Sequence, residues 1–514
     1  MSATPAATGD GGMPPRAPRV PLHTKVSYGL GSVAQAVAGV ALSTSIINFY
    51  LIRVLGLRPA LVGVVILVSL VIDAMVDPAI GRLSDTFRSR WGRRHPFMYA
   101  SAAPIGISIY LLWTQPAGLS PAALAAYVLF WLIALRLCSG VYQIPSDSLI
   151  PELAPDYHER TSLVSFRYFF GIFGGVGMTV LLLNFFLRKD ASHPLGMLDR
   201  AAYGRFGLVA GITVFVAILV STAATHRYIP FLKVPPVRRQ SFLAALREMG
   251  VTLANPAMVV IMIAGLVSGV AGGIAATLGN FMSLYFWGLT PQVIGYIAIF
   301  GAPATIIGVV LAPVVSRRLD KKRAMLIVFF ASIFAGLVPV LLRLSGVVQM
   351  GSPWIPPLLI ADSFISGTLS LIGYVIIGSM VADVVEDSAV RTGVRSEGLL
   401  FAASGLLPKV TTGLGGLVGN LMLEVVHFPA GAGKSVADHV DPTIMRNLVF
   451  LSVPAGMVLN LTAVSVLFLY RLDRRRHESN LEALRLASEI GEPPTALAAS
   501  VPPIVQPDVL ARLD

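Results

Sequence analysis

Two carboxylates occupy the second apolar stretch of the chain. Asp73 and Asp77 lie four residues apart within residues 61–80 (LVGVVILVSLVIDAMVDPAI), and a stretch of about 20 apolar residues can cross a bilayer. A spacing of four puts both side chains on one face of a helix. Because paired carboxylates in lipid repel each other, they need a shared proton, a bound cation or a buried base. The pair is the leading candidate for the working centre of a cation-coupled membrane protein.

Six further ionisable residues lie inside apolar stretches, and they are Arg136, Asp147, Arg167, Asp362, Lys409 and Glu424. Lys409 lies near mid-depth of its stretch and is a natural partner for the carboxylate pair. A structural salt bridge is the alternative, but we favour coupling, because three mid-membrane charges are an expensive way to gain stability. Arg136, Asp362 and Glu424 lie closer to stretch ends, where snorkelling or local pairing is expected. Asp147 is intermediate.

The fourth apolar stretch contains the sequence Tyr142–Gln143–Ile144–Pro145. The proline interrupts the helix, and Gln143 lies near mid-depth, where its amide offers donors and acceptors to a polar substrate. An interhelical hydrogen bond is the alternative role for Gln143. In the tenth stretch, Tyr374 either stacks on an apolar face of a ligand or packs as an ordinary aromatic residue. We assign Tyr142, Gln143 and Tyr374 to a substrate site.

The composition is that of an integral membrane protein. Of the 514 residues, 55% are hydrophobic and 13% are charged, and the mean hydropathy is +0.75, whereas soluble domains average about 25% charged residues. The long apolar runs predict an all-α protein with twelve transmembrane helices. These runs cover residues 27–52, 60–81, 97–114, 121–149, 163–187, 204–224, 256–286, 291–315, 324–345, 354–382, 397–425 and 445–470.

The net charge of +12 reflects membrane topology. With both termini in the cytoplasm, 27 of the 39 Lys and Arg residues lie on the cytoplasmic side and 9 on the other side, as the positive-inside rule requires. This distribution argues against a nucleic-acid binder. The single cysteine, Cys138, excludes an intramolecular disulfide and a thiolate metal cluster. The sequence contains no evident nucleophile–base pair, metal-ligand cluster or phosphate loop, so we do not expect an enzyme.

The basic segment 227–255 is the largest polar interruption and leaves six runs on each side. Basic clusters follow both the second and the eighth run (SDTFRSRWGRRHPF and SRRLDKKRAM), which indicates a duplicated six-span unit. Two such halves describe a transporter that rocks around a midplane site. We expect a disordered cytoplasmic tail at 1–24, an N-terminal half at 25–226, a cytoplasmic linker at 227–255, a C-terminal half at 256–472 and a cytoplasmic tail at 473–514.

Four segments resemble the glycoside–pentoside–hexuronide:cation symporters, a branch of the major facilitator superfamily typified by bacterial melibiose permeases. The most specific is VIDAMVDPAIGRLSDTFRSRWGRRHPF, whose loop is also similar to that of sucrose transporters. The others are YGLGSVAQ in the first span, QIPSDSLIPELAPDYHERTSLVSFR between spans four and five, and MVADVVEDSAVRTGVRSEGLLFAASGLLPK between spans ten and eleven. The match covers residues 25–425 and implies the major facilitator fold, with twelve helices in two six-helix halves.

The resemblance implies roles for individual residues. Asp73 and Asp77 fall on the family's cation-site carboxylates, and Lys409 falls on the span-eleven lysine near them. Tyr374 falls on the aromatic that lines the sugar pocket, and Arg167 lies within one position of the span-five arginine that contacts sugar. Asp383, Arg395 and Glu397 fall on the charge network that closes the cytoplasmic gate. We assign Arg160 to the same gate.

The chain also departs from the family pattern. Two sugar-binding aspartates of melibiose permeases are replaced here by Ala36 and Gln143, which argues against a melibiose-type ligand. The polar neighbours that complete a sodium shell fall on Val76, which has no side-chain oxygen, and on Gly140, which has no side chain. Sodium needs several oxygen ligands, whereas a proton needs one carboxylate, so we favour H⁺ over Na⁺. The paired aspartates would be metal ligands only if Na⁺ were the coupling ion.

We therefore predict a secondary active transporter that carries a glycoside, oligosaccharide or related polar organic solute together with H⁺ or Na⁺, and with no other cofactor. Two alternatives stay open: transport of a lysolipid- or sterol-like amphiphile, and a non-transporting sensor or scaffold on the same fold. The expected location is the bacterial cytoplasmic (inner) membrane, with both termini in the cytoplasm. The expected partners are a small-molecule substrate and the lipid bilayer, with no nucleic acid, and we expect a monomer.

Overall fold

The computed structural model describes residues 20–154, 156–188, 196–231, 255–392, 397–431, 440–470, 472, 478–482 and 485. All the secondary structure of these residues is helical. Eleven helices have the length and hydropathy of a membrane span, and α13 supplies the twelfth. The N-terminal half is built from α1 (Leu22–Ala41), α2 (Thr44–Phe49), η1 (Tyr50–Val54), α3 (Pro59–Thr86), α4 (His95–Trp113), α5 (Pro121–Leu153), α6 (Tyr157–Val180), η2 (Leu181–Phe186), η3 (Gly196–Leu198), α7 (Arg200–His226) and η4 (Ile229–Phe231). The C-terminal half is built from α9 (Pro256–Phe281), η5 (Met282–Phe286), α10 (Pro291–Arg318), α11 (Lys321–Leu344), α12 (Ile355–Thr392), α13 (Glu397–Val425) and α14 (Pro442–Leu467).

Proline and short polar residues mark where many helices begin. α5, α9 and α14 each start at a proline, whose fixed φ suits the first turn of a helix. The residues before these prolines are Ser120, Asn255 and Asp441, and each side chain accepts a hydrogen bond from a backbone N–H group two or three residues further on. These caps satisfy otherwise unpaired donors at the helix starts.

The predicted all-α fold of twelve spans is confirmed. The predicted linker at 227–255 and tail at 473–514 lie largely outside the described residues.

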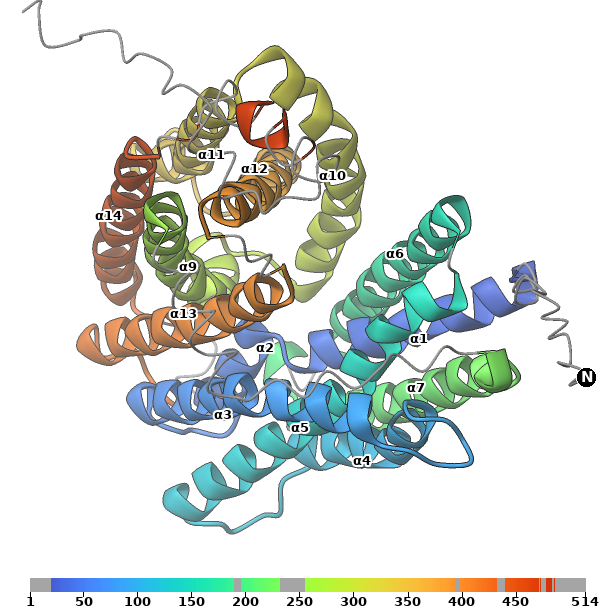
Figure 1. Ribbon diagram of the computed structural model, residues 1–514. Helices are drawn as coiled ribbons and strands as arrows, with labels where there is room; N and C mark the ends of the chain where they lie inside the picture. Colours follow the sequence, from blue (N-terminus) through green and yellow to red (C-terminus); the bar gives the residue numbers. More distant parts are fainter. Residues whose placement is uncertain are drawn as a thin grey trace, which may run out of the picture.

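The helices form two groups, as Figure 1 shows, with α1–α7 in the lower part of the view and α9–α14 in the upper part. Within the first group, α1 packs against α6 and α7, and α4 packs against α5 and α7. Within the second, α9 packs against α13 and α14, and α12 against α10 and α11. We call the end that carries residues 20, 87–94 and 319–321 the basic end. The end that carries residues 55–58, 114–120 and 426–431 is called the opposite end.

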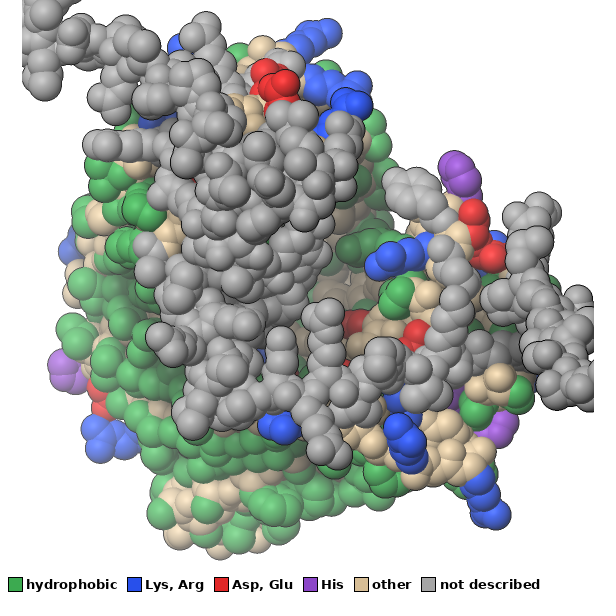
Figure 2. Space-filling view, in the orientation of Figure 1, with side chains coloured by type: hydrophobic (Ala, Val, Ile, Leu, Met, Phe, Trp, Pro, Cys, Tyr) green, Lys and Arg blue, Asp and Glu red, His purple; other side chains and the backbone are tan. Residues whose placement is uncertain are grey.

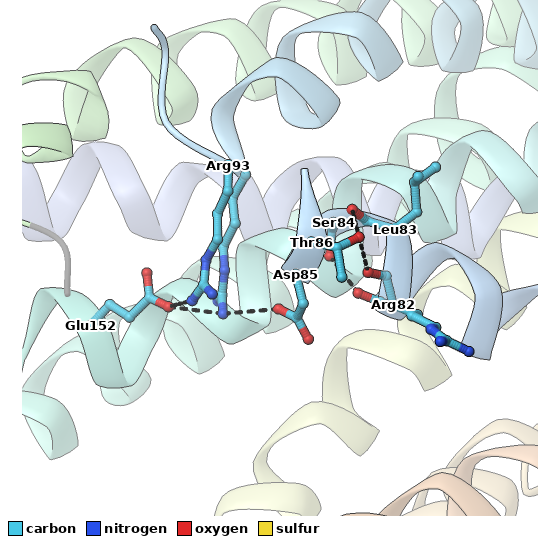
Figure 3. A network of polar contacts seen from close by, with 9 residues as sticks. Arg82, Leu83, Ser84, Asp85, Thr86, Arg93 and Glu152 are labelled. Atoms are coloured by element: carbon cyan, nitrogen blue, oxygen red, sulfur yellow. Dashed lines mark hydrogen bonds and ion pairs between the residues drawn. The ribbon is translucent and has the colours of Figure 1, made fainter. Parts of the chain in front are cut away.

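The same ionic contact recurs at the basic end of each half. In the N-terminal half, Arg93 and Arg94 before α4 both bind Glu152 near the end of α5, and Arg94 Nη2 also lies 3.4 Å from Asp85 Oδ1 (Figure 3). Burial lowers the pKa of the Arg94 guanidinium, which still stays charged near neutral pH. In the C-terminal half, Lys321 binds Asp383 of α12. The two basic loops singled out in the sequence thus tie equivalent helices together within each half.

The two halves meet along α3–α13, α2–α9 and α6–α10. Towards the opposite end, the backbone N–H of Asn280 donates to Ser45 Oγ (3.0 Å), and Asn420 Nδ2 donates to Asn48 Oδ1 (2.7 Å). The space-filling view shows a hollow between the halves with acidic side chains in its wall (Figure 2). Among the described residues, the hydrogen bonds between the halves therefore lie on the side of the hollow nearer the opposite end.

Arg53 is a fully buried cation between the halves at the opposite end. Its Nη1 donates to Pro429 O (2.7 Å) and its Nε to Tyr285 OH (3.1 Å). The guanidinium also lies 5.5 Å from the ring centre of Tyr285 and 5.7 Å from that of Phe428, within the range of cation–π attraction. The π-helical turn η1 carries Arg53 into this interface.

Close helix packing generates the first prediction. A Cβ atom at Gly211 of α7 would lie 2.6 Å from the carbonyl oxygen of Gly106 on α4, whereas one at Gly456 of α14 has no neighbour within 4 Å. Gly211→Ala is therefore expected to push α4 and α7 apart and to lower the free energy of unfolding by about 1–3 kcal/mol. The thermal midpoints of both purified variants measure this, and Gly456→Ala is the control. Equal midpoints for the two variants would contradict the close contact.

Candidate functional site

The carboxylates of α3 and the lysine of α13 meet between the two halves. Lys409 Nζ lies 2.8 Å from Asp73 Oδ2 and 2.5 Å from Asp77 Oδ2. Asp73 is only 6% exposed, and Asp77 and Lys409 are partly buried. As the spacing of four predicts, both carboxylates present an oxygen to one partner. One cation from the C-terminal half therefore bridges two anions of the N-terminal half.

A second cation reaches the same group from α5. Arg136 Nη1 lies 3.9 Å from Asp73 Oδ2, and Arg136 Nε donates to Ser69 Oγ (3.2 Å), one turn before Asp73. We call Asp73, Asp77, Lys409 and Arg136 the carboxylate cluster. Sequence analysis placed Arg136 near a span end, but α5 runs from Pro121 to Leu153, so Arg136 lies near its middle. Its distance from both helix ends was the signal that could have identified it.

The formal charges of the carboxylate cluster sum to zero when all four groups are ionised. Opposite charges a few ångströms apart attract strongly where water is largely excluded, and this attraction offsets part of the cost of burial. Protonating one aspartate would leave the cluster with one positive charge in excess. The ionic contact that joins the two halves at this point therefore consists of one cation shared by two anions.

The cluster lies at one end of a continuous seam between α3 and α13. At the opposite end of the molecule, Arg58 Nη2 binds Glu424 Oε1 (2.6 Å), which confirms the local pairing expected for Glu424. Further along, Gly63 contacts Leu417 and Asn420, and Gly413 contacts Leu67 and Leu70. Of these seam contacts, the one that Lys409 makes lies farthest from the opposite end.

A second polar group belongs to the N-terminal half alone. Arg167 of α6 pairs with Asp147 of α5, and its guanidinium also donates to Ser32 Oγ (3.1 Å) and Gln35 Oε1 (3.2 Å) of α1. The same guanidinium lies 5.4 Å from the ring centre of Tyr28. We call these five residues the arginine network. Sequence analysis singled out Arg167 and Asp147 separately but predicted no contact between them, and it assigned no role to Ser32, Gln35 or Tyr28.

One stripe of α5 connects the two groups. Arg136, Gly140, Gln143 and Asp147 are spaced by four, three and four residues, so they lie on one helix face. Arg136 binds within the carboxylate cluster, and a Cβ at Gly140 would lie 3.0 Å from Asp77 Oδ1. Asp147 binds within the arginine network, and Gln143, between the two, is exposed. The stripe spans about 16 Å along the helix axis.

The remaining predicted substrate residues differ in exposure. Tyr374 of α12 is 71% exposed, on the side of the helix away from buried Ile372 and Ile376. Tyr142 is 2% exposed and belongs to the packed core, with its hydroxyl group beside Gly31 of α1. In this conformation Tyr142 is packed against α1, and its assignment to the substrate site stays a prediction.

The predicted gate residues are only partly described. Asp383 binds Lys321 within its own half, with Nζ 2.7 Å from Oδ2. Arg160 is exposed near the start of α6. Arg395 and the side chain of Glu397 lie outside the described residues. The intramembrane Asp362 accepts a hydrogen bond from Ser366 Oγ (2.9 Å) one turn away, which is the local pairing expected for it.

These features define a multi-pass membrane transporter with two six-helix halves and a charged centre. The chain belongs to the family described as MFS/sugar transport protein, which matches residues 27–474. This finding confirms the resemblance seen in the sequence, together with the expectation of a transporter and not an enzyme.

Named relatives are similar over most of their length. The isoprimeverose transporter of Lactiplantibacillus pentosus is 24% identical, with 88% of this chain and 90% of the relative covered. An uncharacterized symporter of Bacillus subtilis (YnaJ) is 25% identical, with 91% and 95% covered. A glucuronide carrier protein homolog of Escherichia coli is 24% identical, with 77% and 85% covered.

Solved structures share the fold at low sequence identity. A nucleoside transporter (NupG) superimposes with a TM-score of 0.60 and 16% identity, covering 86% of this chain and 99% of its own. The inward-open xylose transporter XylE of E. coli superimposes with a TM-score of 0.58 and 14% identity, covering 90% and 98%. These likenesses establish the major facilitator fold.

The balanced charges of the cluster generate the second prediction. Lys409→Met removes one cation and leaves a net negative charge, so we expect a loss of about 2 kcal/mol, below the cost of about 3–5 kcal/mol for breaking a fully buried pair. The double variant Lys409→Met/Asp77→Asn restores the balance and should recover part of the loss. Thermal midpoints of the purified proteins test this. Additive losses in the double variant would show that the two side chains do not interact.

Proposed function

We propose that this protein is a cation-coupled symporter that carries a sugar or glycoside with H⁺ by alternating access. The single observation that supports this most directly is the contact of Lys409 with Asp73 and Asp77, because it joins the two halves through two carboxylates that could carry a proton. A transporter of this type rocks its halves around a site near the midplane. The basic end would face the cytoplasm of a bacterium, and the chain would act as a monomer.

The coupling step can be written with the residues of the cluster. A proton that binds Asp77, the more exposed carboxylate, removes one of the two anions that hold Lys409. Lys409 keeps its contact with Asp73, and the α3–α13 seam loses its charged contact nearest the hollow. The halves then rock with the solute between them. Release of the proton towards the basic end restores the bridge of Lys409 to both carboxylates.

The arginine network supports a hydroxylated solute. Arg167 supplies donors, Asp147 supplies acceptors and Gln35 supplies both, which suits the mixed hydrogen bonding of sugar hydroxyl groups. Gln143 would add a further polar contact, and Tyr374 would cover a less polar face of the ring from the other half. The charged network is less suited to the lysolipid- or sterol-like amphiphile.

Coupling to protons is the third prediction. The test uses proteoliposomes that contain no substrate at the start. A pH gradient with the acidic side outside should drive accumulation of the transported glycoside, and a sodium gradient at fixed pH should have little effect. Asp73→Asn and Asp77→Asn should each abolish accumulation, because neither amide can release a proton. The control is Asp362→Asn, which removes an intramembrane aspartate outside the cluster and should still accumulate solute.

Two results would contradict this proposal. Accumulation by either cluster variant at the wild-type level would remove the pair from coupling. Strong stimulation by sodium, without proton movement alongside the solute, would show that the coupling ion is Na⁺ and not H⁺. The cluster would then be the candidate site for Na⁺.

The location of the solute is the fourth prediction. Gln143→Ala, Arg167→Ala and Tyr374→Ala should each weaken binding of a transported glycoside to the purified protein by about five- to tenfold, as expected for one lost hydrogen bond or ring contact. Tyr168→Ala, at an exposed aromatic of α6 outside the proposed pocket, is the control. Isothermal titration with the folded variants measures the affinities, and unchanged values in all three would place the pocket elsewhere.

A further inference from the structure

A cavity of about 540 Å³ lies at the opposite end of the N-terminal half, away from the carboxylate cluster and the arginine network. The end of α4, the loop after it and the start of α7 line this cavity, which is shallow and largely open to the outside. Its volume is within the range of small-molecule sites in proteins, about 300–1,000 Å³. The residues that line it are Tyr110, Trp113, Thr114, Gln115, Ala117, Arg200, Ala201, Gly204, Arg205 and Leu208.

The aromatic residue Trp113 gives the cavity a rigid wall. The ring stacks on Tyr203 with centroids 5.4 Å apart and packs against Tyr50 at 5.0 Å, and Gly207 lets α7 approach its Cβ. Trp113 is 1% exposed, and its indole Nε1 has no hydrogen-bond partner among the described residues.

Two arginines make the cavity positive. Arg200 Nη2 donates to the carbonyl oxygen of Gln115 (2.8 Å), which fixes its guanidinium at the cavity. Arg205 is exposed and binds Asp199, with Nη2 3.1 Å from Oδ2. Asp199 caps α7 and does not line the cavity. With two cations and this one neighbouring carboxylate, the site keeps a net positive charge.

An exposed apolar face continues from the cavity along the same two helices. Leu208, Ile212 and Val216 follow each other at intervals of four on α7 and are 48%, 55% and 50% exposed. Ile107 of α4, beside the close contact of Gly106 with Gly211, is 53% exposed. In a membrane protein such a face lies against acyl chains, so the charged cavity meets the apolar face where headgroups meet the bilayer core.

We propose that this cavity binds the headgroup of an anionic phospholipid in the leaflet at the opposite end. Guanidinium groups recognise phosphate through paired hydrogen bonds, and Arg200 and Arg205 would hold the phosphate. The acyl chains would follow the apolar face of α4 and α7. A soluble phosphate would use the two arginines but not this face, so the combination favours a lipid.

The test measures bound lipid by native mass spectrometry on the delipidated full-length protein after addition of phosphatidylglycerol. Near a membrane surface, each arginine contributes a factor of about five to the attraction of an anionic lipid, so Arg200→Gln/Arg205→Gln should reduce binding about 25-fold. The matched control, Arg188→Gln/Arg446→Gln, removes two exposed arginines from the same end and should bind like wild type. Arg200→Lys/Arg205→Lys keeps the charges and should retain most of the lipid.

Three results would overturn the proposal. Undiminished lipid on Arg200→Gln/Arg205→Gln, with a wild-type thermal midpoint, would exclude the cavity as the site. An equal loss in the control variant would show that general surface charge holds the lipid. Displacement of phosphatidylglycerol by inorganic phosphate at equal concentration would make this a site for a soluble anion. Because bound lipid is measured without solute or transport, these outcomes are independent of the proposed function.

Discussion

The fold depends on an electrostatic requirement within the membrane. Two carboxylates one turn apart on α3 cannot both remain ionised in a low-dielectric interior without a cation. The chain supplies that cation as Lys409, from a helix of the other half. Satisfying the charge of one helix thus requires the two halves to meet at mid-depth. Arg136 balances the remaining negative charge from within the N-terminal half, so the site is neutral only while the halves are in contact.

The contacts within each half and the contacts between the halves serve different purposes. Arg94 with Glu152, and Lys321 with Asp383, hold helices of one half together at the basic end. The contacts between halves are instead the seam of α3 with α13 and a few hydrogen bonds nearer the opposite end, together with buried Arg53. The interface between the halves thus combines the apolar packing of α3 against α13 with a few polar groups, whereas each half has ionic contacts of its own at the basic end.

Hydropathy was enough to predict the twelve spans, because every backbone polar group in lipid must be paired within a helix. The bridge from Lys409 to the carboxylates also followed, since mid-depth charges on different helices have few partners. Helix orientation did not follow. Tyr142 and Gln143 are neighbours about 100° apart on α5, and one is packed in the core while the other is exposed. A single sequence does not say which side of an apolar helix faces the hollow. Arg136 was misjudged for a different reason, because it was placed near the end of a span although it lies near the middle of α5.

In the proposed function, the stripe on α5 would connect the ion site with the solute site, which do not touch each other. Arg136 and Gly140 adjoin the carboxylate cluster, and Asp147 adjoins the arginine network about 16 Å away along the same helix face. A helix held by hydrogen bonds along its length transmits a small shift or tilt from one end of this stripe to the other. If Asp73 lost its charge, the attraction between Asp73 and Arg136 would weaken. A solute that binds Asp147 would weaken the attraction between Asp147 and Arg167 at the other end of the stripe. Both changes would act on the position of α5 relative to α3 and α6. An ion and a solute could therefore each shift this helix, and through it influence each other's binding.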